Sequence, residues 1–200
     1  LSAKVTGSGD LAFDSQKEQT VTLSNMDNEY SGINNVRSGN PAMLNDNVLG
    51  KASELKLADS TGFDMRGHAQ TVGKLTAEKG SLTSLNGGHL TLTDGGESAG
   101  ELAGAGRLTV AGGTLNVSGA NAALKATTTI ARGATASLNN ALGLGTGNIV
   151  AAGLLNLNKA AGVLYNSLSD AGEVALIATR GALGVGYRGF LGTVAVGRAS

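Results

Sequence analysis

The sequence contains no cysteine and no tryptophan, and it has only one proline, three phenylalanines and three tyrosines. The absence of cysteine excludes disulfides, thiolate nucleophiles and cysteine-based zinc or iron–sulfur sites. So few aromatic rings argue against an ordinary compact core built around them. The 200 residues are nevertheless 41% hydrophobic, which predicts a folded chain, and their 32 glycines predict many tight turns.

Charge of one sign is also lacking. Fifteen basic residues balance fifteen acidic ones, so the formal net charge is zero and no long run of one sign occurs. This balance gives no electrostatic support for binding to nucleic acid or to an anionic membrane, and we predict no nucleic-acid partner. The sequence has neither a signal-peptide pattern at Leu1 nor an apolar run of about 18 residues that would predict a transmembrane helix. We expect an excised segment of a longer polypeptide.

Internal repeats are the most informative feature that is present. A nine-residue pattern, apolar-x-(Gly/Asp)-x-Gly-x-apolar-x-apolar, occurs in VTGSGDLAF, LAGAGRLTV and LSDAGEVAL, at residues 5–13, 102–110 and 168–176. Two further pairs of similar segments are 30–39 with 190–199, and 48–57 with 141–150. Repetition at several places in the chain predicts a fold built from stacked units.

A shorter period predicts the kind of unit. The last apolar residues of matching runs, Leu92, Val110, Ile130 and Val150, lie 18, 20 and 20 residues apart, a spacing typical of solenoids. The runs themselves are short, rich in Val, Thr, Ile and Leu, and bounded by glycines, which indicates strands and turns. Only residues 40–58 could hold a turn of helix, and there too we expect loop and strand.

The sequence therefore predicts an all-β protein: a right-handed parallel β-helix, or solenoid, of roughly ten coils with three short strands per coil. Such a coil encloses a thin column that aliphatic side chains fill, and glycines suit its corners. We expect Asn86, Asn116 and Asn156 at corners, where asparagines can form ladders.

Two adjoining segments carry a resemblance to a known family. FDMRGHAQTVGKLTAEKGSLTSLNGGHLTLTDGG at 63–96, with GELAGAGRLTVAGGTLNVSGAN at 100–121, resembles the passenger domain of classical (type Va) autotransporters, closest to the AIDA-type adhesin and self-associating family and more distantly to the pertactin-like β-helix. The resemblance covers roughly residues 5–199. It implies that 1–200 is a single β-helical passenger segment without signal peptide or C-terminal β-barrel translocator, in which 160–200 would be a membrane-proximal end.

The resemblance also implies a function. A passenger is exported through the periplasm and displayed on the cell surface, anchored to the outer membrane by the barrel of its parent protein. The expected role is a stalk segment in adhesion, self-association or virulence, whose partners are that barrel and other copies of the passenger or host surface molecules. Two alternatives stay open: an autochaperone region that promotes passenger folding and secretion, and a polysaccharide lyase or hydrolase, which would need a groove lined by carboxylates and basic residues.

We assign no catalytic, cofactor-binding or metal site, and we expect no enzyme. Asp64, Arg66 and His68 alternate and should share one strand face, which we interpret as a solvated face rather than a site for a sugar acid. His89 has no nearby acid and serine that would suggest a triad.

Three further patterns receive structural interpretations. The acids Asp94, Glu97 and Glu101 lack the calcium-binding nonapeptide and are interpreted as loop charges. The glycine-rich segments 7–10 and 143–147 are not followed by Gly-Lys-Ser/Thr, so we interpret them as corners and not as phosphate loops. The sequon at 116–118 is common by chance.

Overall fold

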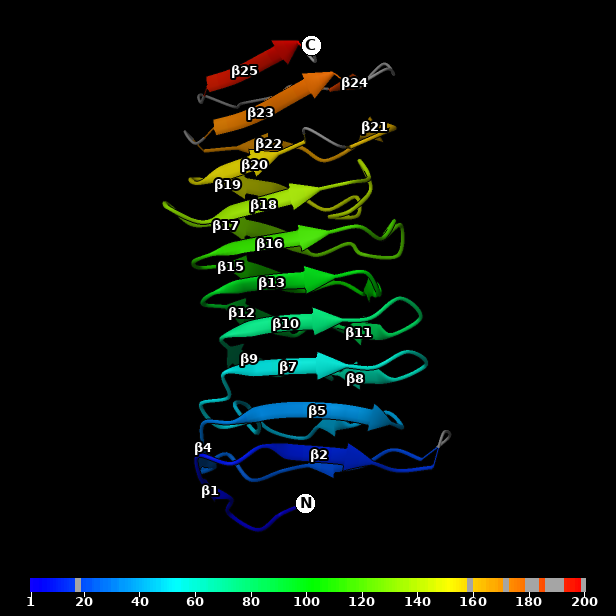
Figure 1. Ribbon diagram of the computed structural model, residues 1–200, viewed down its shortest axis with the longest axis vertical. Helices are drawn as coiled ribbons and strands as arrows, with labels where there is room; N and C mark the ends of the chain where they lie inside the picture. Colours follow the sequence, from blue (N-terminus) through cyan, green and yellow to red (C-terminus); the bar gives the residue numbers. More distant parts are fainter. Residues whose placement is uncertain (17–18, 158–159, 171–172, 179–183, 186–192, 199–200) are drawn as a thin grey trace.

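The protein is a single β-solenoid. Its computed structural model describes residues 1–16, 19–157, 160–170, 173–178, 184–185 and 193–198. In these residues the regular elements are strands, and every strand pairing is parallel. Strands stack along one axis from β1 (Thr6–Gly7) to β25 (Thr193–Arg198), which lie at opposite ends of the rod (Figure 1).

Three sheets run along the rod, and each coil adds one strand to the longest of them. The long sheet has ten strands: β2 (Leu11–Asp14), β5 (Ile33–Ser38), β7 (Glu54–Leu57), β10 (Lys74–Ala77), β13 (Gly95–Ser98), β16 (Thr114–Val117), β18 (Thr135–Leu138), β20 (Leu154–Asn156), β23 (Glu173–Ala178) and β25. The short sheet has five: β3 (Thr22–Leu23), β6 (Ala42–Met43), β8 (Gly62–Asp64), β11 (Leu82–Ser84) and β14 (Glu101–Ala103).

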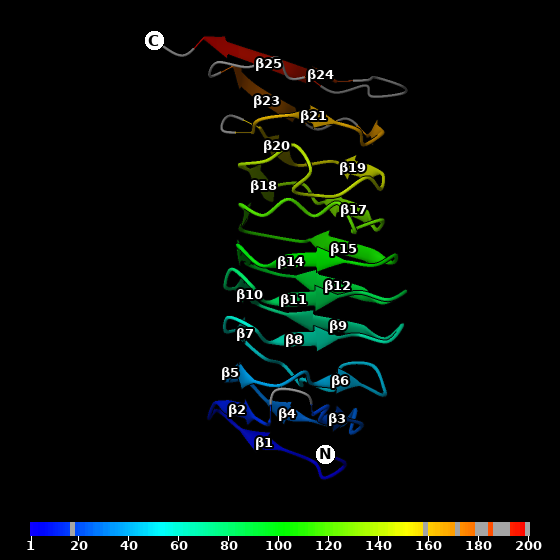
Figure 2. The ribbon, with the colours of Figure 1, turned by 90° about the vertical axis from the view of Figure 1, so that its right-hand side faces the viewer.

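The third sheet has six strands: β9 (Ala69–Val72), β12 (His89–Leu92), β15 (Arg107–Val110), β17 (Thr127–Ile130), β19 (Ile149–Ala151) and β22 (Leu168–Ser169). Figure 2 shows the short and third sheets stacked on the side of the rod turned toward the viewer. Two small pairs complete the described strands: β1 with β4 (Glu29–Tyr30), and β21 (Val163–Leu164) with β24 (Gly184–Val185).

The coil is right-handed, as predicted. In Figure 1 the strands of the long sheet lie in front and point to the right, those of the third sheet lie behind them, and the chain rises from β2 to β25. The ten strands of the long sheet agree with the expected number of coils. Among the described residues, however, all three sheets contribute a strand only to the coils that begin with β7, β10 and β13.

The core is a narrow column of aliphatic side chains. Residues of adjacent coils stack in register, so that Leu55 lies beside Leu75 and Leu57 beside Ala77. All four are 0–3% exposed, and complete burial of a leucine contributes about 1.5–3 kcal/mol. Between Phe63 and Tyr165 the sequence has no Phe, Tyr or Trp, so aliphatic side chains fill the middle of the column, whereas the rings of Phe13 and Phe63 are buried nearer its N-terminal end.

The nine-residue repeat proves to be a corner motif. Its third residue has a positive φ in each copy: 113° at Gly7, 88° at Gly104 and 78° at Asp170. The first and third copies lead from β1 into β2 and from β22 into β23, whereas the second leads from β14 into β15. The same local sequence therefore turns the chain at two different edges of the coil. Residues 171–172 of the third copy lie outside the described residues.

Other details of the repeat analysis need correction. Leu92, Val110 and Ile130 do stack in register, but Ile130 pairs with Ala151 and not with Val150. Val150 faces outward between two buried neighbours, because a small alanine continues the inner row.

The predictions for asparagines and for residues 40–58 had mixed outcomes. Asn86 does occupy a corner, with φ 44°, but Asn116 and Asn156 lie within β16 and β20. Residues 40–58 form β6, a series of turns and β7, without helix. Residues 190–192 and 199 of the pair 30–39 with 190–199, and much of the expected membrane-proximal segment 160–200, lie outside the described residues.

Buried amides connect coils where the strand ladders are interrupted. The Asn121 side chain accepts a hydrogen bond from Leu102 N–H one coil below (2.9 Å) and donates to the Gly143 carbonyl one coil above (2.7 Å). Asn28 likewise accepts from Val5 N–H (2.8 Å) and donates to the Val48 carbonyl (2.7 Å). A buried backbone group without a partner is costly, so each amide replaces a missing ladder bond on both sides.

Replacing Asn121 by alanine should destabilise the solenoid by about 2–4 kcal/mol, because it leaves a buried N–H and a buried carbonyl unpaired. Asn116→Ala is the matched control: Asn116 is exposed on a strand, so its loss should cost less than about 1 kcal/mol. Urea unfolding followed by circular dichroism measures both. Equal losses in the two variants would contradict the role given to Asn121.

Candidate functional site

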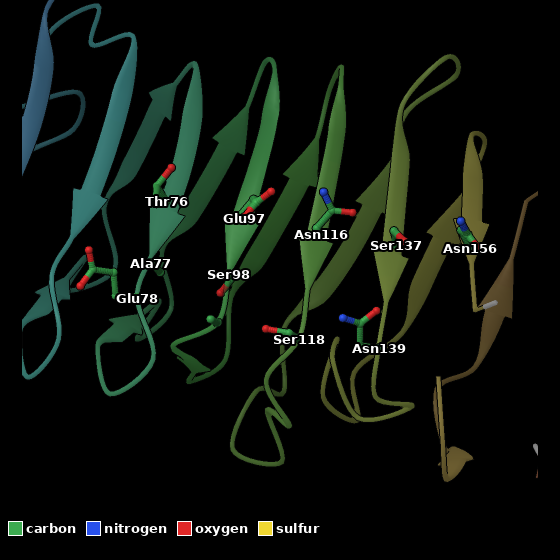
Figure 3. Close-up of a pocket in the computed structure, with 11 residues that line it drawn as sticks. Thr76, Ala77, Glu78, Glu97, Ser98, Asn116, Ser118, Ser137, Asn139 and Asn156 are labelled. Carbon is green, nitrogen blue, oxygen red and sulfur yellow. The ribbon is translucent and has the colours of Figure 1, made fainter. Parts of the chain in front are cut away.

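A polar groove lies along the long sheet in the described part of the chain. Its volume is about 720 Å³, and Figure 3 shows it spanning successive coils. The lining comprises Thr76, Ala77, Glu78, Glu97, Ser98, Ala99, Asn116, Ser118, Ser137, Asn139 and Asn156.

Strand register builds the floor of the groove. The backbone pairing places Thr76 beside Glu97, Glu97 beside Asn116, Asn116 beside Ser137 and Ser137 beside Asn156. Successive side chains of a strand point to opposite faces, so this row points outward while its sequence neighbours fill the core. In Figure 3 the side chains of this row, from Thr76 to Asn156, follow one another along the sheet.

Residues just beyond the strand ends form the second side of the groove. Glu78, Ala99, Ser118 and Asn139 each follow a floor residue by two positions and are exposed. Their backbones are fixed to the coil below: Glu78 N–H donates to the Leu57 carbonyl at 2.9 Å and Asn139 N–H to the Val117 carbonyl at 2.9 Å. The side chains are thus presented from a hydrogen-bonded scaffold.

The groove offers amides, hydroxyls and two carboxylates. Glu78 Oε2 accepts a 3.2 Å hydrogen bond from Asp59 N–H. The side chains of Asn116, Ser118, Ser137 and Asn139 make no hydrogen bond with any described residue, and no lysine, arginine or histidine is among the lining. These side chains can donate hydrogen bonds to a polar ligand and accept hydrogen bonds from it at several coils at once.

The structure separates Asp64, Arg66 and His68, which the sequence analysis placed on one strand face. The strand β8 ends at Asp64, whose Oδ1 accepts from Arg66 N–H (3.1 Å), and Arg66 turns the chain with φ 48°. The Arg66 side chain returns to Asp64, with Nε 3.5 Å from Oδ2. The single-face prediction is therefore wrong: an Asx-type turn ends the strand.

His68 pairs with the coil below instead. Its Nδ1 lies 3.2 Å from Asp46 Oδ1, which also accepts from Ala69 N–H at 2.9 Å. Donation from Ala69 N–H, with a smaller contribution from His68, lowers the pKa of the Asp46 carboxyl. These contacts join two coils and leave no shared site with Asp64.

His89 lies on the outer face of the third sheet. Its Nε2 is 2.8 Å from Thr109 Oγ1 on the next coil, and the backbone pairs His89 with Arg107. Partial burial lowers the pKa of His89, and the positive charge of Arg107 lowers it further. His89 Nε2 also lies 3.4 Å from Thr91 Oγ1, so the imidazole contacts threonines of its own coil and of the next one.

The remaining candidates are dispersed. Asp94 pairs with Lys74 (3.2 Å), Glu97 lies in the groove and Glu101 begins β14 in the short sheet. No group of three or more His, Asp or Glu among the described residues is placed to hold a metal ion, and those residues form no helix long and apolar enough to cross a membrane.

The glycine-rich segments and the sequon also have defined places. Residues 7–10 connect β1 with β2, and 143–147 lie in the turns before β19, so both are corners as expected. Asn116 and Ser118 of the sequon both line the groove. Sequence reasoning missed this groove, although the spacing of Thr76, Glu97, Asn116, Ser137 and Asn156 near the coil period was a usable signal.

Comparison with known proteins finds relatives but no family. No protein-family model matches the chain, and no solved structure matches it significantly. The uncharacterized protein YuaQ of Escherichia coli K12 is 51% identical over 156 residues, and the uncharacterized lipoprotein YdeK of the same strain is 42% identical over 178 residues. These alignments cover 78% and 89% of this chain but only 11% and 13% of the two relatives. The chain thus spans a small part of each relative's length.

Arg107→Gln should raise the pKa of His89, because it removes the nearby positive charge. The pKa should stay below its ordinary value of about 6.5, since burial is the larger cause and persists. NMR titration of the imidazole Cε1–H measures the change. The pKa of His89 is lower in the folded chain than in the unfolded chain. The contribution of neutral His89 to folding stability is therefore fully present at a pH above the unfolded-state pKa, and it is lost as the pH falls through the folded-state pKa. An unchanged pKa in the variant would contradict the assigned Arg107 contribution.

Proposed function

We propose that the chain is a segment of a surface-exposed β-helical stalk, belonging to the passenger of a bacterial autotransporter, that acts in adhesion or self-association. The observation that carries the proposal is the continuous groove, in which coil after coil presents outward amide and hydroxyl side chains on a fixed backbone. An adhesive stalk needs such a repeated, exposed polar surface and needs neither cofactor nor deep pocket.

The size of the relatives supports a stalk. Because the aligned parts of the chain cover only 11% and 13% of two much longer proteins, the chain fits the role of one stretch of coils within an extended passenger. Ten coils at a spacing of about 4.8 Å span on the order of 50 Å, and a longer chain with the same architecture would extend the rod in proportion to its number of coils.

The name of one relative supports a location. YdeK is named as a lipoprotein, and bacterial lipoproteins are attached to membranes of the cell envelope. This name supports a location in the cell envelope. Anchoring at the cell surface through the barrel of a parent protein is our further proposal, and it rests on the resemblance to autotransporter passengers.

The physical chemistry of the fold suits export. Each coil buries its apolar side chains against the coil before it, so the passenger can fold coil by coil outside the membrane. Each folded coil then opposes the return of the translocated segment through the membrane. The absence of cysteine also avoids disulfides that would close in the oxidising periplasm before transit.

An enzyme is the less supported alternative. A polysaccharide lyase or hydrolase was expected to need both carboxylates and basic side chains in its groove. The lining contains the carboxylates Glu78 and Glu97 but no lysine, arginine or histidine. The groove favours binding over bond cleavage.

Deleting residues 1–200 in frame from the parent protein should leave surface display intact and reduce cell aggregation and adhesion to the level of cells without the protein. Display is measured with an antibody against an epitope tag placed outside the deletion, and aggregation by settling of the culture. A parallel deletion of whole coils elsewhere in the passenger controls for shortening of the stalk.

Two results would contradict this proposal. Collapse of display itself would indicate the autochaperone alternative, because the segment would then be needed for secretion. Normal display with unchanged aggregation and adhesion would place the adhesive surface outside this chain.

A further inference from the structure

The groove repeats its geometry with the period of the solenoid. Neighbouring coils of a parallel sheet are about 4.8 Å apart, and each coil from β13 to β20 adds one outward polar side chain to the floor. Figure 3 shows this row running along the axis, with Ser118 and Asn139 beside it. A ligand with the same repeat would meet a similar set of groups at every step. Each sugar unit of an extended β-1,4-linked polysaccharide advances by close to this spacing. Alternate units are turned over, so equivalent hydroxyls recur at every second coil.

The lining chemistry matches sugar hydroxyls. Each asparagine side chain both donates and accepts hydrogen bonds, as does each serine hydroxyl. Asn116, Ser118, Ser137 and Asn139 are not engaged with any described residue, so a ligand need not break existing protein contacts. The buried Ser98, 1% exposed, also lines the groove, and its Oγ has no hydrogen-bond partner among the described residues.

The charge of the lining disfavours an anionic ligand. The charged side chains in the groove are the acids Glu78 and Glu97 at one end, and the remainder is neutral. An anionic polymer would face repulsion there and would find no cation in the lining to compensate. Lys56 continues the floor row one coil below Thr76 but is not part of the lining.

A peptide is a poor occupant. Recognition by strand addition requires a free sheet edge, yet β10, β13, β16, β18 and β20 are each paired on both sides. Side-chain anchoring requires apolar pockets, and the apolar side chains of the lining are only Ala77 and Ala99.

A second copy of the chain also fits poorly in the groove. Stable interfaces pack as closely as protein interiors. If two copies met through this groove, one concave surface would face another. Each copy would then contribute an unfilled space of about 720 Å³ to the interface.

We propose that the groove binds an extended, uncharged polysaccharide that runs along the solenoid axis, with about one sugar unit facing each coil. This inference rests on the proposed adhesive function and names the ligand class of the groove. Asn116 and Asn139 supply the central hydrogen bonds, from the floor and from the second side.

NMR titration of the ¹⁵N-labelled 200-residue chain with cellohexaose, β-1,4-mannohexaose and hexa-N-acetylchitohexaose tests the proposal. At least one of these neutral β-1,4-linked oligosaccharides should shift the backbone amide signals of Glu97, Asn116, Ser118, Ser137 and Asn139. The double variant Asn116→Ala/Asn139→Ala should weaken binding about tenfold. Thr109→Ala/Thr129→Ala, on the third sheet, should bind as the unchanged chain does, and the thermal midpoints of both variants show whether the fold is kept.

Three results would overturn the proposal: no shift of groove signals with any of the three oligosaccharides, stronger shifts with a heparin-derived hexasaccharide, or shifts that depend on the concentration of the protein alone. The second would indicate an anionic ligand and the third self-association. Loss of adhesion on deletion without binding of these oligosaccharides would leave the proposed function standing and reject only the ligand class.

Discussion

Parallel backbone pairing between successive coils is the constraint on which every other feature of this protein depends. Pairing in register fixes which side chain lies above which, as with Leu55 and Leu75 inside the column and Asn116 and Ser137 outside it. The same hydrogen bonds therefore create both the aliphatic core and the polar groove. A shift of one residue would exchange the two faces, so the buried row and the exposed row specify each other.

Where strands are too short to continue the ladder, side-chain amides and corner residues maintain the stack. Asn28 and Asn121 each join the coil below to the coil above through the backbone groups that the ladder leaves unpaired. Corners require residues that accept a positive φ, which explains Gly7 and Gly104 and the single aspartate, Asp170, at the equivalent position. The surface can therefore vary from coil to coil while the backbone path stays constant, a property well suited to an adhesive stalk.

Most of the fold could be predicted from the sequence because each coil is built from a short, continuous stretch of about 20 residues whose pattern recurs along the chain. Short alternating runs and the nine-residue corner motif repeat often enough to indicate stacked parallel coils. The predicted pairing of Val150 failed because the inner row continues with the small Ala151, which hydrophobic size alone does not reveal. The prediction that Asp64, Arg66 and His68 share a strand face was wrong because the Asp64 carboxylate accepts a hydrogen bond from Arg66 N–H. The resulting turn ends the strand at Asp64. The groove could not be found from one local motif, since it is assembled from one to three residues of each of five coils.

Distances between spin labels on the outer row test the coil-by-coil register most directly, and the cysteine-free chain allows labels at chosen sites only. Lys56 and Ser137 are separated by four coil spacings, and Lys56 and Asn156 by five. The account predicts narrow distributions centred at about 19 Å and about 24 Å between the attachment points, so that the second exceeds the first by one coil. Equal distances, or broad distributions in both pairs, would contradict the stacked register from which the core and the groove both follow.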